Sequence, residues 1–299
     1  MTPVSVAALN TIFRFTTIVI LTPAIGLLER IACLVIKDEP RSDENSDWDL
    51  LEDRFIQHPA LAIEQCRIVS NSMAKHVQAN ITDALALLHD YSDAGFDRIQ
   101  DTEELVDQYE DKLGTYIVQI TTAELTQQQN EDVYQFLHAI TDLERISDHA
   151  SNIAENAKEI STKSIPLSDD LLSEMSVMEN ALSEVVSTSI HALTEHDREA
   201  ALRVEPLEER IDELCAEMKH RCIDRMTKGV YTRQNSFVFN DLIGNFERVS
   251  DHCSNIAIAM IELENDAFDM HNYLEDLMNR KDEVFEKYYE IYQKKYTFD

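Results

Sequence analysis

Apolar residues recur every three to four positions from about residue 60 to the end of the chain, the spacing that gives a helix one buried face. Short groups of turn-forming residues interrupt this pattern, for example Ser92 to Gly95 and Gly229 to Gln234. The pattern therefore predicts an all-α fold. The expected helices span residues 60–91, 97–125, 130–162, 167–195, 198–227, 233–266 and 269–295.

Composition supports long helices joined by short turns. The 299 residues include only five glycines and six prolines, whereas 44% of them are hydrophobic. Glycine and proline are the residues that most often interrupt helices, so their scarcity favours uninterrupted helical segments. The hydrophobic content is large enough to build a sizeable core, which argues against a disordered chain.

An internal repeat divides the helical region in two. Residues 144–154, ERISDHASNIA, return as residues 247–257, ERVSDHCSNIA, with nine of eleven positions identical. A second pair lies upstream: EELVD contains Glu104 and Asp107, and EERID contains Glu209 and Asp212. Because 37 and 35 residues separate the paired motifs, the repeated unit is longer than one helix. The sequence predicts tandem three-helix bundles, at residues 60–165 and 166–266.

The repeated motif gathers oxygen atoms on one helix face. Glu144 and Asp148 are four residues apart, and Asn152 lies one turn further on, so all three project from the same side. Leu137 and Ile140 precede them on that line. Carboxylates that interrupt an apolar line cost free energy unless a positive charge neutralises them.

Two kinds of neutralising partner fit this pattern, and spacing alone leaves both open. One is a bound divalent or trivalent cation, because such ions prefer carboxylate and amide oxygens. The other is a structural ion-pair network that uses Arg145, Arg248 or a cation on a neighbouring helix. The candidate metal ligands are Glu144, Asp148, Glu247, Asp251, Asp107, Asp212, Glu104 and Glu209.

The residues that commonly perform catalysis are not arranged for it. His149 and His252 directly follow the aspartates, which turns them about 100° away from the carboxylate face. In the repeated motif the histidine lies five residues after the glutamate, which is not the Glu-x-x-His spacing of di-iron bundles, and nucleophile motifs and glycine-rich phosphate loops are absent from the sequence. We therefore do not expect an enzyme.

The first forty residues differ from the rest. Residues 15–28, FTTIVILTPAIGLL, are uncharged, and the apolar character resumes after Arg30. We interpret residues 1–37 as a hydrophobic N-terminal helix that spans a membrane, with a helix docked on the body as the alternative. The polar segment 38–59 is the expected linker, and residues 267–299 are expected to hold a C-terminal helix.

The net charge and the spacing of the cysteines limit which ligands and binding partners the chain can have. The formal net charge is -31, which disfavours nucleic acid through long-range repulsion and favours cations or basic partner surfaces. Five cysteines with scattered spacing suggest neither a disulfide framework nor a zinc site, so we expect reduced thiols that pack in the core.

At these motifs the sequence resembles the PhoU family, whose members have two three-helix bundles that each carry an E(D)xxxD motif. ERISDHASNIAENA and ERVSDHCSNIAIAM look like its two copies, and EELVD and EERID resemble the partner-helix signature. The resemblance implies multinuclear metal sites, with iron or another divalent or trivalent ion. It also implies a role in restraining phosphate uptake and signalling.

The N-terminal segment ALNTIFRFTTIVILTPAIGLLERI is similar to the last transmembrane helix of bacterial sodium-dependent phosphate cotransporters, which often end in a PhoU-like domain. This second resemblance implies a regulatory domain at the inner membrane, with most of the chain in the cytoplasm and a transporter membrane domain or other transport component as partner. Association into a homodimer stays open. The alternative function is a helical scaffold that docks a partner, with neither a metal nor a direct role in transport.

Overall fold

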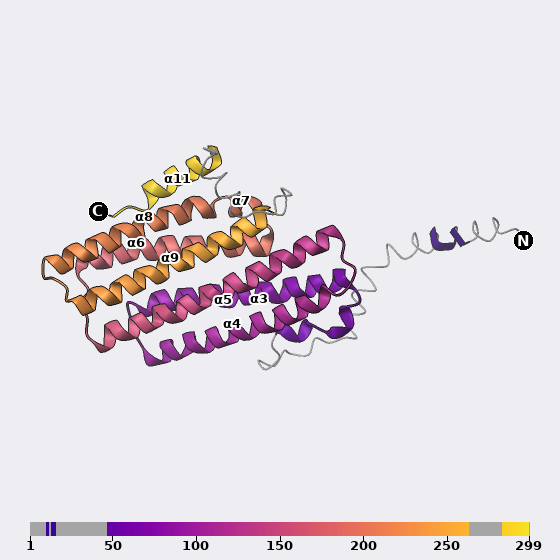
Figure 1. Cartoon of the computed structure of the whole chain (residues 1–299), viewed down its shortest axis with the longest axis horizontal. Coiled ribbons are helices and arrows are strands. Elements are labelled where there is room, and N and C mark those ends of the chain that lie inside the picture. The colour runs from indigo at the N-terminus through magenta and orange to yellow at the C-terminus, as the bar shows by residue number, and fades with distance from the viewer. Residues whose placement is uncertain (1–9, 12, 16–46, 263–282, 299) are drawn as a thin grey trace, which may run out of the picture. The chain divides into compact units, whose positions relative to one another are not determined.

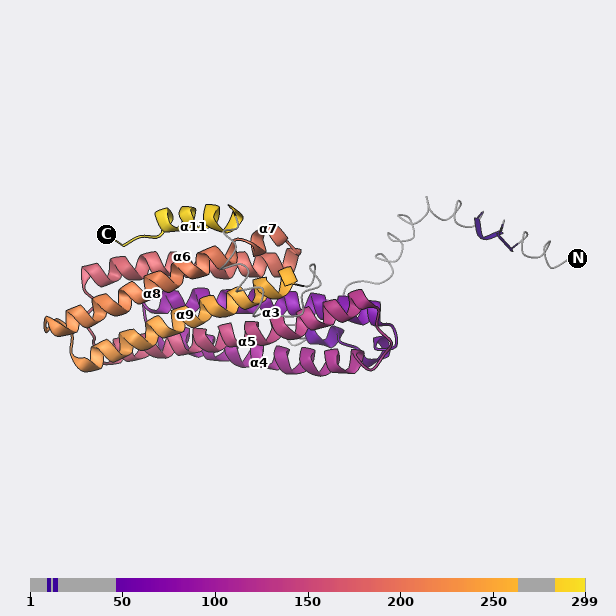
Figure 2. The ribbon, with the colours of Figure 1, turned by 45° about the horizontal axis from the view of Figure 1, so that its top comes forward.

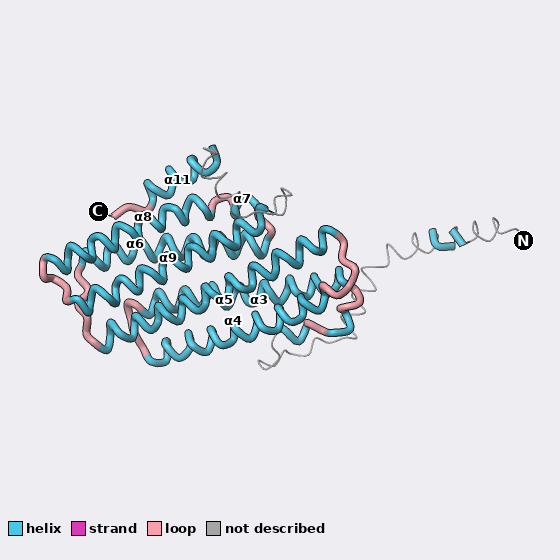
Figure 3. The backbone as a smooth tube through the Cα atoms, in the orientation of Figure 1, coloured by secondary structure: helices cyan, strands magenta, loops and turns pink. Residues whose placement is uncertain are grey.

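The computed structural model describes residues 10, 11, 13–15, 47–262 and 283–298. The chain divides into two units, Met1–Ser46 and Asp47–Asp299. All regular elements of the described part of the second unit are helices, which confirms the all-α prediction there (Figure 3). They are η2 (Asp47–Leu50), η3 (Asp53–Phe55), α3 (Pro59–Leu87), α4 (Asp93–Ile120), α5 (Gln127–Thr162), α6 (Asp169–Glu195), α7 (Arg198–Ala201), α8 (Val204–Thr227), α9 (Arg233–Glu262) and α11 (Glu283–Lys295).

The long helices of this second unit form two three-helix bundles. Helices α3, α4 and α5 pack on one another as the first bundle, and α6, α8 and α9 form the second (Figure 1). The most extensive contact between any two helices joins α5 to α9, and α3 also packs against α6. Both views show α5 and α9 side by side along their length (Figure 2). The two helices that carry the repeated motif therefore form the centre of the unit.

Side-chain caps set where several helices begin. The hydroxyl of Ser92 accepts a hydrogen bond from the Gly95 amide at 3.1 Å, so α4 starts at Asp93 rather than near residue 97. Thr126 and Gln129 form a reciprocal capping box at the start of α5. A Cβ atom at Gly95 would lie 2.8 Å from a terminal methyl group of Leu87 and 2.9 Å from the Ser92 hydroxyl, so a larger residue would force these side chains to shift.

The predicted helix 198–227 is two helices. His196 ends α6 in the left-handed conformation, with a φ of 52°, and Asp197 caps the short helix α7 through the Ala200 amide. Helix α8 then begins at Val204 and places Pro206 in its first turn. Proline is tolerated there because the amide hydrogen of a first-turn residue has no intrahelical partner.

The core explains the two positions at which the repeats differ. Ile146 and its counterpart Val249 are fully buried, as are Ala150 and its counterpart Cys253. Conservative exchanges of size are tolerated at such positions, whereas polar groups are not. Four cysteines are free and buried, as expected for thiols used in packing: Cys66, Cys215, Cys222 and Cys253.

Helices that precede and follow the two bundles in the chain pack against them. The segment predicted as a linker, residues 38–59, contains η2 and η3, and Trp48 packs edge-on against Tyr109 with ring centroids 4.9 Å apart. At the other edge α11 packs on α8, where the guanidinium of Arg210 donates a hydrogen bond to the Tyr296 carbonyl at 2.8 Å. Of the predicted C-terminal region 267–299, residues 267–282 and 299 lie outside the described residues.

The predicted membrane helix at residues 1–37 lies almost wholly outside the described residues, of which it includes only 10, 11 and 13–15. Among the helices that the structure describes, none combines the length and the apolar character needed to span a bilayer.

Candidate functional site

Carboxylates from α4 and α5 meet on the first bundle. Glu103 and Asp107 lie four residues apart on α4, and Glu144 and Asp148 lie four apart on α5. The carboxyl groups of Glu103 and Asp148 share a hydrogen bond, and the charges of Asp107 and Glu110 act on Glu144. We call these five residues the first cluster.

The second bundle carries the equivalent group on α8 and α9. Oxygen atoms of Glu208, Asp212 and Asp251 lie within 4.8 Å of one another, and all three residues are partly buried. The charges of Glu205 and Glu247 reach this group, the first acting on Glu208 and the second on Asp212. These five residues form the second cluster.

Burial and mutual repulsion raise the pKa values of the acids in the second cluster. Burial, followed by the charges of Glu205 and Asp212, raises the pKa of Glu208 to about 9. Burial, followed by the charges of Asp251 and Glu247, raises the pKa of Asp212 to about 6. Burial also raises the pKa of Asp251. In the absence of a cation, Glu208 therefore holds a proton at neutral pH.

The first cluster shows the same effect in a milder form. Burial, followed by the charge of Asp148, raises the pKa of Glu144 to about 7, although Arg145 opposes the shift. Burial and the charge of Asp148 also raise the pKa of Glu103. A guanidinium nitrogen of Arg145 lies 3.4 Å from Glu144, and another lies 3.4 Å from Asp148.

Basic side chains at the two clusters neutralise the acids only in part. Arg145 and Arg248 are more than half exposed, and Arg248 lies 3.4 Å from Asp251. Exposed ion pairs are screened by water and contribute little. A more direct pair joins Lys219 of α8 to Glu247. The structural ion-pair network is thus present, but it leaves most of the acidic oxygens unmatched.

The donor atoms of the second cluster fit a cation. One carboxylate oxygen of Asp212 is inaccessible to water and has no hydrogen-bond partner among the described residues. A buried acceptor without a partner is costly, and a metal ion would satisfy it. The three converging carboxylates suit hard or borderline ions. Cation binding by these residues stays a prediction.

Six of the eight predicted ligands lie in the two clusters, Glu104 and Glu209 do not, and four cluster members were not predicted: Glu103, Glu110, Glu205 and Glu208. Glu104 is exposed on α4, and Glu209 lies outside the group of three on α8. The preceding residues, Glu103 and Glu208, are the ones that join the clusters. Their signal was available, because each lies four residues before the cluster aspartate of its helix, and a single-residue shift turns a side chain about 100° around the helix.

The two histidines of the motif connect the bundles. The rings of His149 and His252 stack with centroids 5.7 Å apart, which agrees with the expected rotation away from the carboxylate face. His149 hydrogen-bonds the Asn245 side chain at 2.9 Å, and His252 bonds Asp142 at 2.9 Å. Asp142 and Asn245 each lie two residues before the glutamate of their motif, Glu144 or Glu247. The motif histidine of each bundle therefore hydrogen-bonds the same position of the other bundle.

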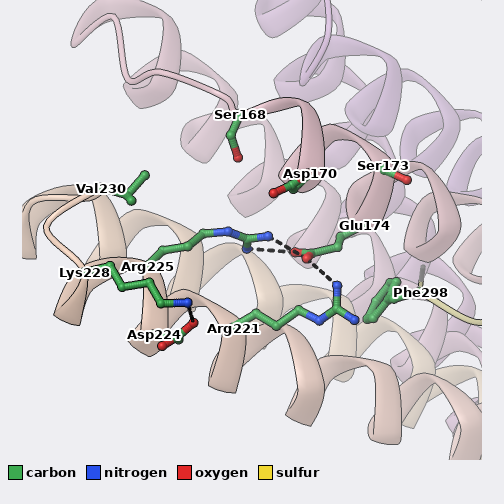
Figure 4. Close-up of a pocket in the computed structure, with 10 residues that line it drawn as sticks. All are labelled: Ser168, Asp170, Ser173, Glu174, Arg221, Asp224, Arg225, Lys228, Val230 and Phe298. Atoms are coloured by element: carbon green, nitrogen blue, oxygen red, sulfur yellow. Dashed lines mark hydrogen bonds and ion pairs between the residues drawn. The ribbon is translucent and has the colours of Figure 1, made fainter.

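A hollow of about 500 Å³ lies at the other end of α8, about 20 Å from Asp212 by helix rise (Figure 4). Its centre is Glu174, 2% exposed, which accepts hydrogen bonds from Arg225 at 2.5 and 2.8 Å and from Arg221 at 2.9 Å. Lys228 pairs with Asp224 in the same hollow. Since its bases are already matched by acids, we assign this hollow to the packing of α6 against α8.

The structure therefore defines an all-helical protein with two three-helix bundles in tandem, each of which carries a carboxylate cluster on one face. Residues 71–157 and 175–260 each match the model of the PhoU domain family. Together these matches cover more than half of the chain, which therefore belongs to this family.

One named relative and two solved structures are similar to this chain. The "Phosphate-specific transport system accessory protein PhoU homolog 1" of Thermotoga maritima is 24% identical over 194 residues, covering 63% of this chain and 81% of that protein. The PhoU crystal structure from Pseudomonas aeruginosa superposes with a TM-score of 0.64 at 19% identity, covering 68% of this chain and 97% of that one. The phosphate transport system regulatory protein PhoU from Streptococcus pneumoniae gives 0.63 at 18% identity, with coverages of 71% and 99%. At these identities the two structures support the fold alone.

Proposed function

We propose that this chain is a regulator of a phosphate transport system and that its two carboxylate clusters bind divalent or trivalent cations. The regulatory role is supported by membership of the PhoU domain family and by the similarity to a phosphate-specific transport accessory protein. Cation binding is supported by the convergence of Glu208, Asp212 and Asp251 around a buried oxygen that has no partner.

Glu208, Asp212 and Asp251 would hold the ion in the second bundle, and Glu103, Asp107 and Asp148 would hold it in the first. A bound ion would supply the positive charge that the packed acids lack. It would also link α4 to α5 and α8 to α9, since each cluster draws its ligands from two helices. Loading of the clusters would thereby change the rigidity of the surface that these helices present to a partner.

The test for cation binding is elemental analysis of the full chain after purification without chelators. We expect the wild type to retain a transition metal and the double variant Asp148→Asn with Asp251→Asn to lose it. The matched control is Asp132→Asn with Asp224→Asn, which removes two aspartates outside both clusters. A metal-free wild type that also fails to bind added Mn²⁺ would favour the alternative, a helical scaffold held by ion pairs.

The finer proposal concerns the partner. Residues 15–28 contain no charged side chain, and the resemblance of the N-terminal segment to a cotransporter helix suggests attachment to a phosphate carrier in the inner membrane. Fractionation of cells that express the full chain or a chain without residues 1–37 tests this point. We expect only the full chain in the membrane fraction, and equal distribution of both would exclude the attachment.

The regulatory role has its own test. Deletion of the gene in its host should change the uptake of inorganic phosphate, and the wild-type gene should restore it. Unchanged uptake under both phosphate limitation and phosphate excess would contradict the proposal.

A further inference from the structure

The repeat allows the two clusters to be compared position by position. Residues of α4 correspond to residues of α8 that lie 105 positions later, which pairs Glu103 with Glu208 and Asp107 with Asp212. Residues of α5 correspond to residues of α9 that lie 103 positions later. Four acids of each cluster correspond in this way, and the fifth does not, because Glu110 aligns with Cys215 and Glu205 aligns with Gln100. Each cluster thus has five acids with one arginine beside it, Arg145 or Arg248.

One hydrogen bond in each bundle supports this correspondence. Gln100 of α4 donates to the Ser151 hydroxyl at 2.6 Å. At the matching positions of the second bundle, Ser254 donates to the carboxylate of Glu205. The same two helix positions therefore contact each other in both bundles.

One position adds a positive charge to the second cluster alone. Lys219 on α8 pairs with Glu247 through its ammonium group, and the corresponding residue of α4 is Gly114. A lysine ammonium is charged at neutral pH, and this one forms an ion pair with a carboxylate of the second cluster. Its positive charge also acts on Asp212. The second cluster thus has a lysine in addition to its arginine, whereas the first cluster has Arg145 alone.

We propose that Lys219 acts as a built-in competitor for metal ions, so that the first cluster binds a cation more tightly than the second. This inference rests on the proposed cation-binding function. A metal held by Glu208, Asp212 and Asp251 would lie beside this ammonium, which pairs with the neighbouring Glu247 and acts on Asp212. Among the described residues, no lysine pairs with Glu144, the counterpart of Glu247. Lys219 is therefore a residue that sets relative affinity and is not a metal ligand.

The experiment exchanges the charge between the bundles and follows Mn²⁺ binding by calorimetry and by electron paramagnetic resonance of the free ion. Lys219→Met removes the ammonium from the second cluster, and Gly114→Lys adds one to the first. A Cβ atom at Gly114 meets only the Ile140 side chain, at 3.9 Å, and lysine is a better helix former than glycine. Both variants should therefore fold. Lys228→Met is the matched control, because it removes a lysine that pairs with Asp224.

Each variant is measured in two backgrounds that isolate one cluster. Asp148→Asn leaves only the second cluster intact, and Asp251→Asn leaves only the first. In the first of these backgrounds Lys219→Met should tighten Mn²⁺ binding about tenfold, since a like charge has been removed next to the ion. In the second, Gly114→Lys should weaken binding by about the same factor. Lys228→Met should change neither.

The outcomes distinguish a failure of cation binding from a failure of the role given to Lys219. Failure of all these proteins to bind Mn²⁺ would overturn the cation-binding function itself. Binding by both clusters with equal affinity, unchanged by Lys219→Met, would overturn the role of Lys219 while leaving cation binding intact.

Discussion

Partly buried carboxyl groups that lie beside one another must share protons or accept a positive ion. In the second cluster this conflict is greatest at Glu208, whose carboxyl group faces Glu205, Asp212 and Asp251. The corresponding Glu103 has Gln100 one turn before it, where Glu208 has Glu205, so its surroundings carry less negative charge. Individual acids of the two clusters therefore respond differently to pH, although the motif is almost identical.

This conflict predicts how stability depends on pH. The pKa values of Asp212, Glu144 and Glu208 rise from 3.8, 4.5 and 4.5 to about 6, 7 and 9. Between these values the folded protein keeps protons that the unfolded chain has released, so these groups make the cation-free protein less stable as pH rises. Thermal unfolding between about pH 5.5 and 8 should show the decrease, and Mn²⁺ should reduce it because the ion replaces the protons.

The control for this prediction is Glu208→Gln, which cannot release a proton and should flatten the decrease in the cation-free protein. An identical pH dependence for wild type, wild type with Mn²⁺ and this variant would show that the clusters do not govern the response.

At the scale of helices, the packing of α6 against α8 depends on one buried acid. Glu174 of α6 is held by two arginines of α8, and its environment admits almost no water. Removal of one partner from a buried ion pair leaves an uncompensated charge, which costs far more than the loss of an exposed pair. This contact therefore fixes how the two helices pack at the end of the bundle far from the cluster.

We expect Glu174→Ala to lower the free energy of unfolding by about 3–5 kcal/mol, because Arg221 and Arg225 lose their shared acceptor. Glu217→Ala, which removes only an exposed partner of Arg221, should cost no more than about 1 kcal/mol. Urea unfolding followed by far-ultraviolet circular dichroism measures both values. Equal effects of the two substitutions would mean that burial of Glu174 does not matter.

Helices were predictable from the sequence because apolar spacing and turn residues act locally. The sequence located α9 at its start, Arg233, although the break between α7 and α8 was missed. The repeat also identified the aspartates of the clusters. Glu103 rather than Glu104 joins the first cluster because of the face that α4 turns toward α5. Lys219 pairs with Glu247 because α8 packs against α9. Such contacts between helices are not local, so the spacing of residues alone left them undetermined.

At the scale of the whole second unit, α5 and α9 join the bundles through polar groups as well as apolar ones. Asp142 accepts hydrogen bonds from His252 at 2.9 Å and from Asn255 at 3.1 Å, both across the bundle boundary. Its side chain is only 14% exposed. With the extensive α5–α9 contact, this arrangement predicts that the two bundles unfold together.

Asp142→Ala should lower the free energy of unfolding by about 1–3 kcal/mol, because two donors lose their acceptor, while the transition remains single. Asp101→Ala, on an exposed site of α4, should change it by less than about 0.5 kcal/mol. Urea denaturation recorded by circular dichroism and by Trp48 fluorescence checks both points. Transitions that separate between the two probes would show that the bundles are independent.

The covalent union of the two bundles has an evolutionary consequence. If an identical pair of separate subunits formed the same assembly, every substitution would appear twice and the two halves would stay alike. Duplication within one polypeptide removes that constraint, so a lysine can arise in one half while the other keeps glycine. Divergence of this kind would let a single molecule report two different concentrations of the same metal.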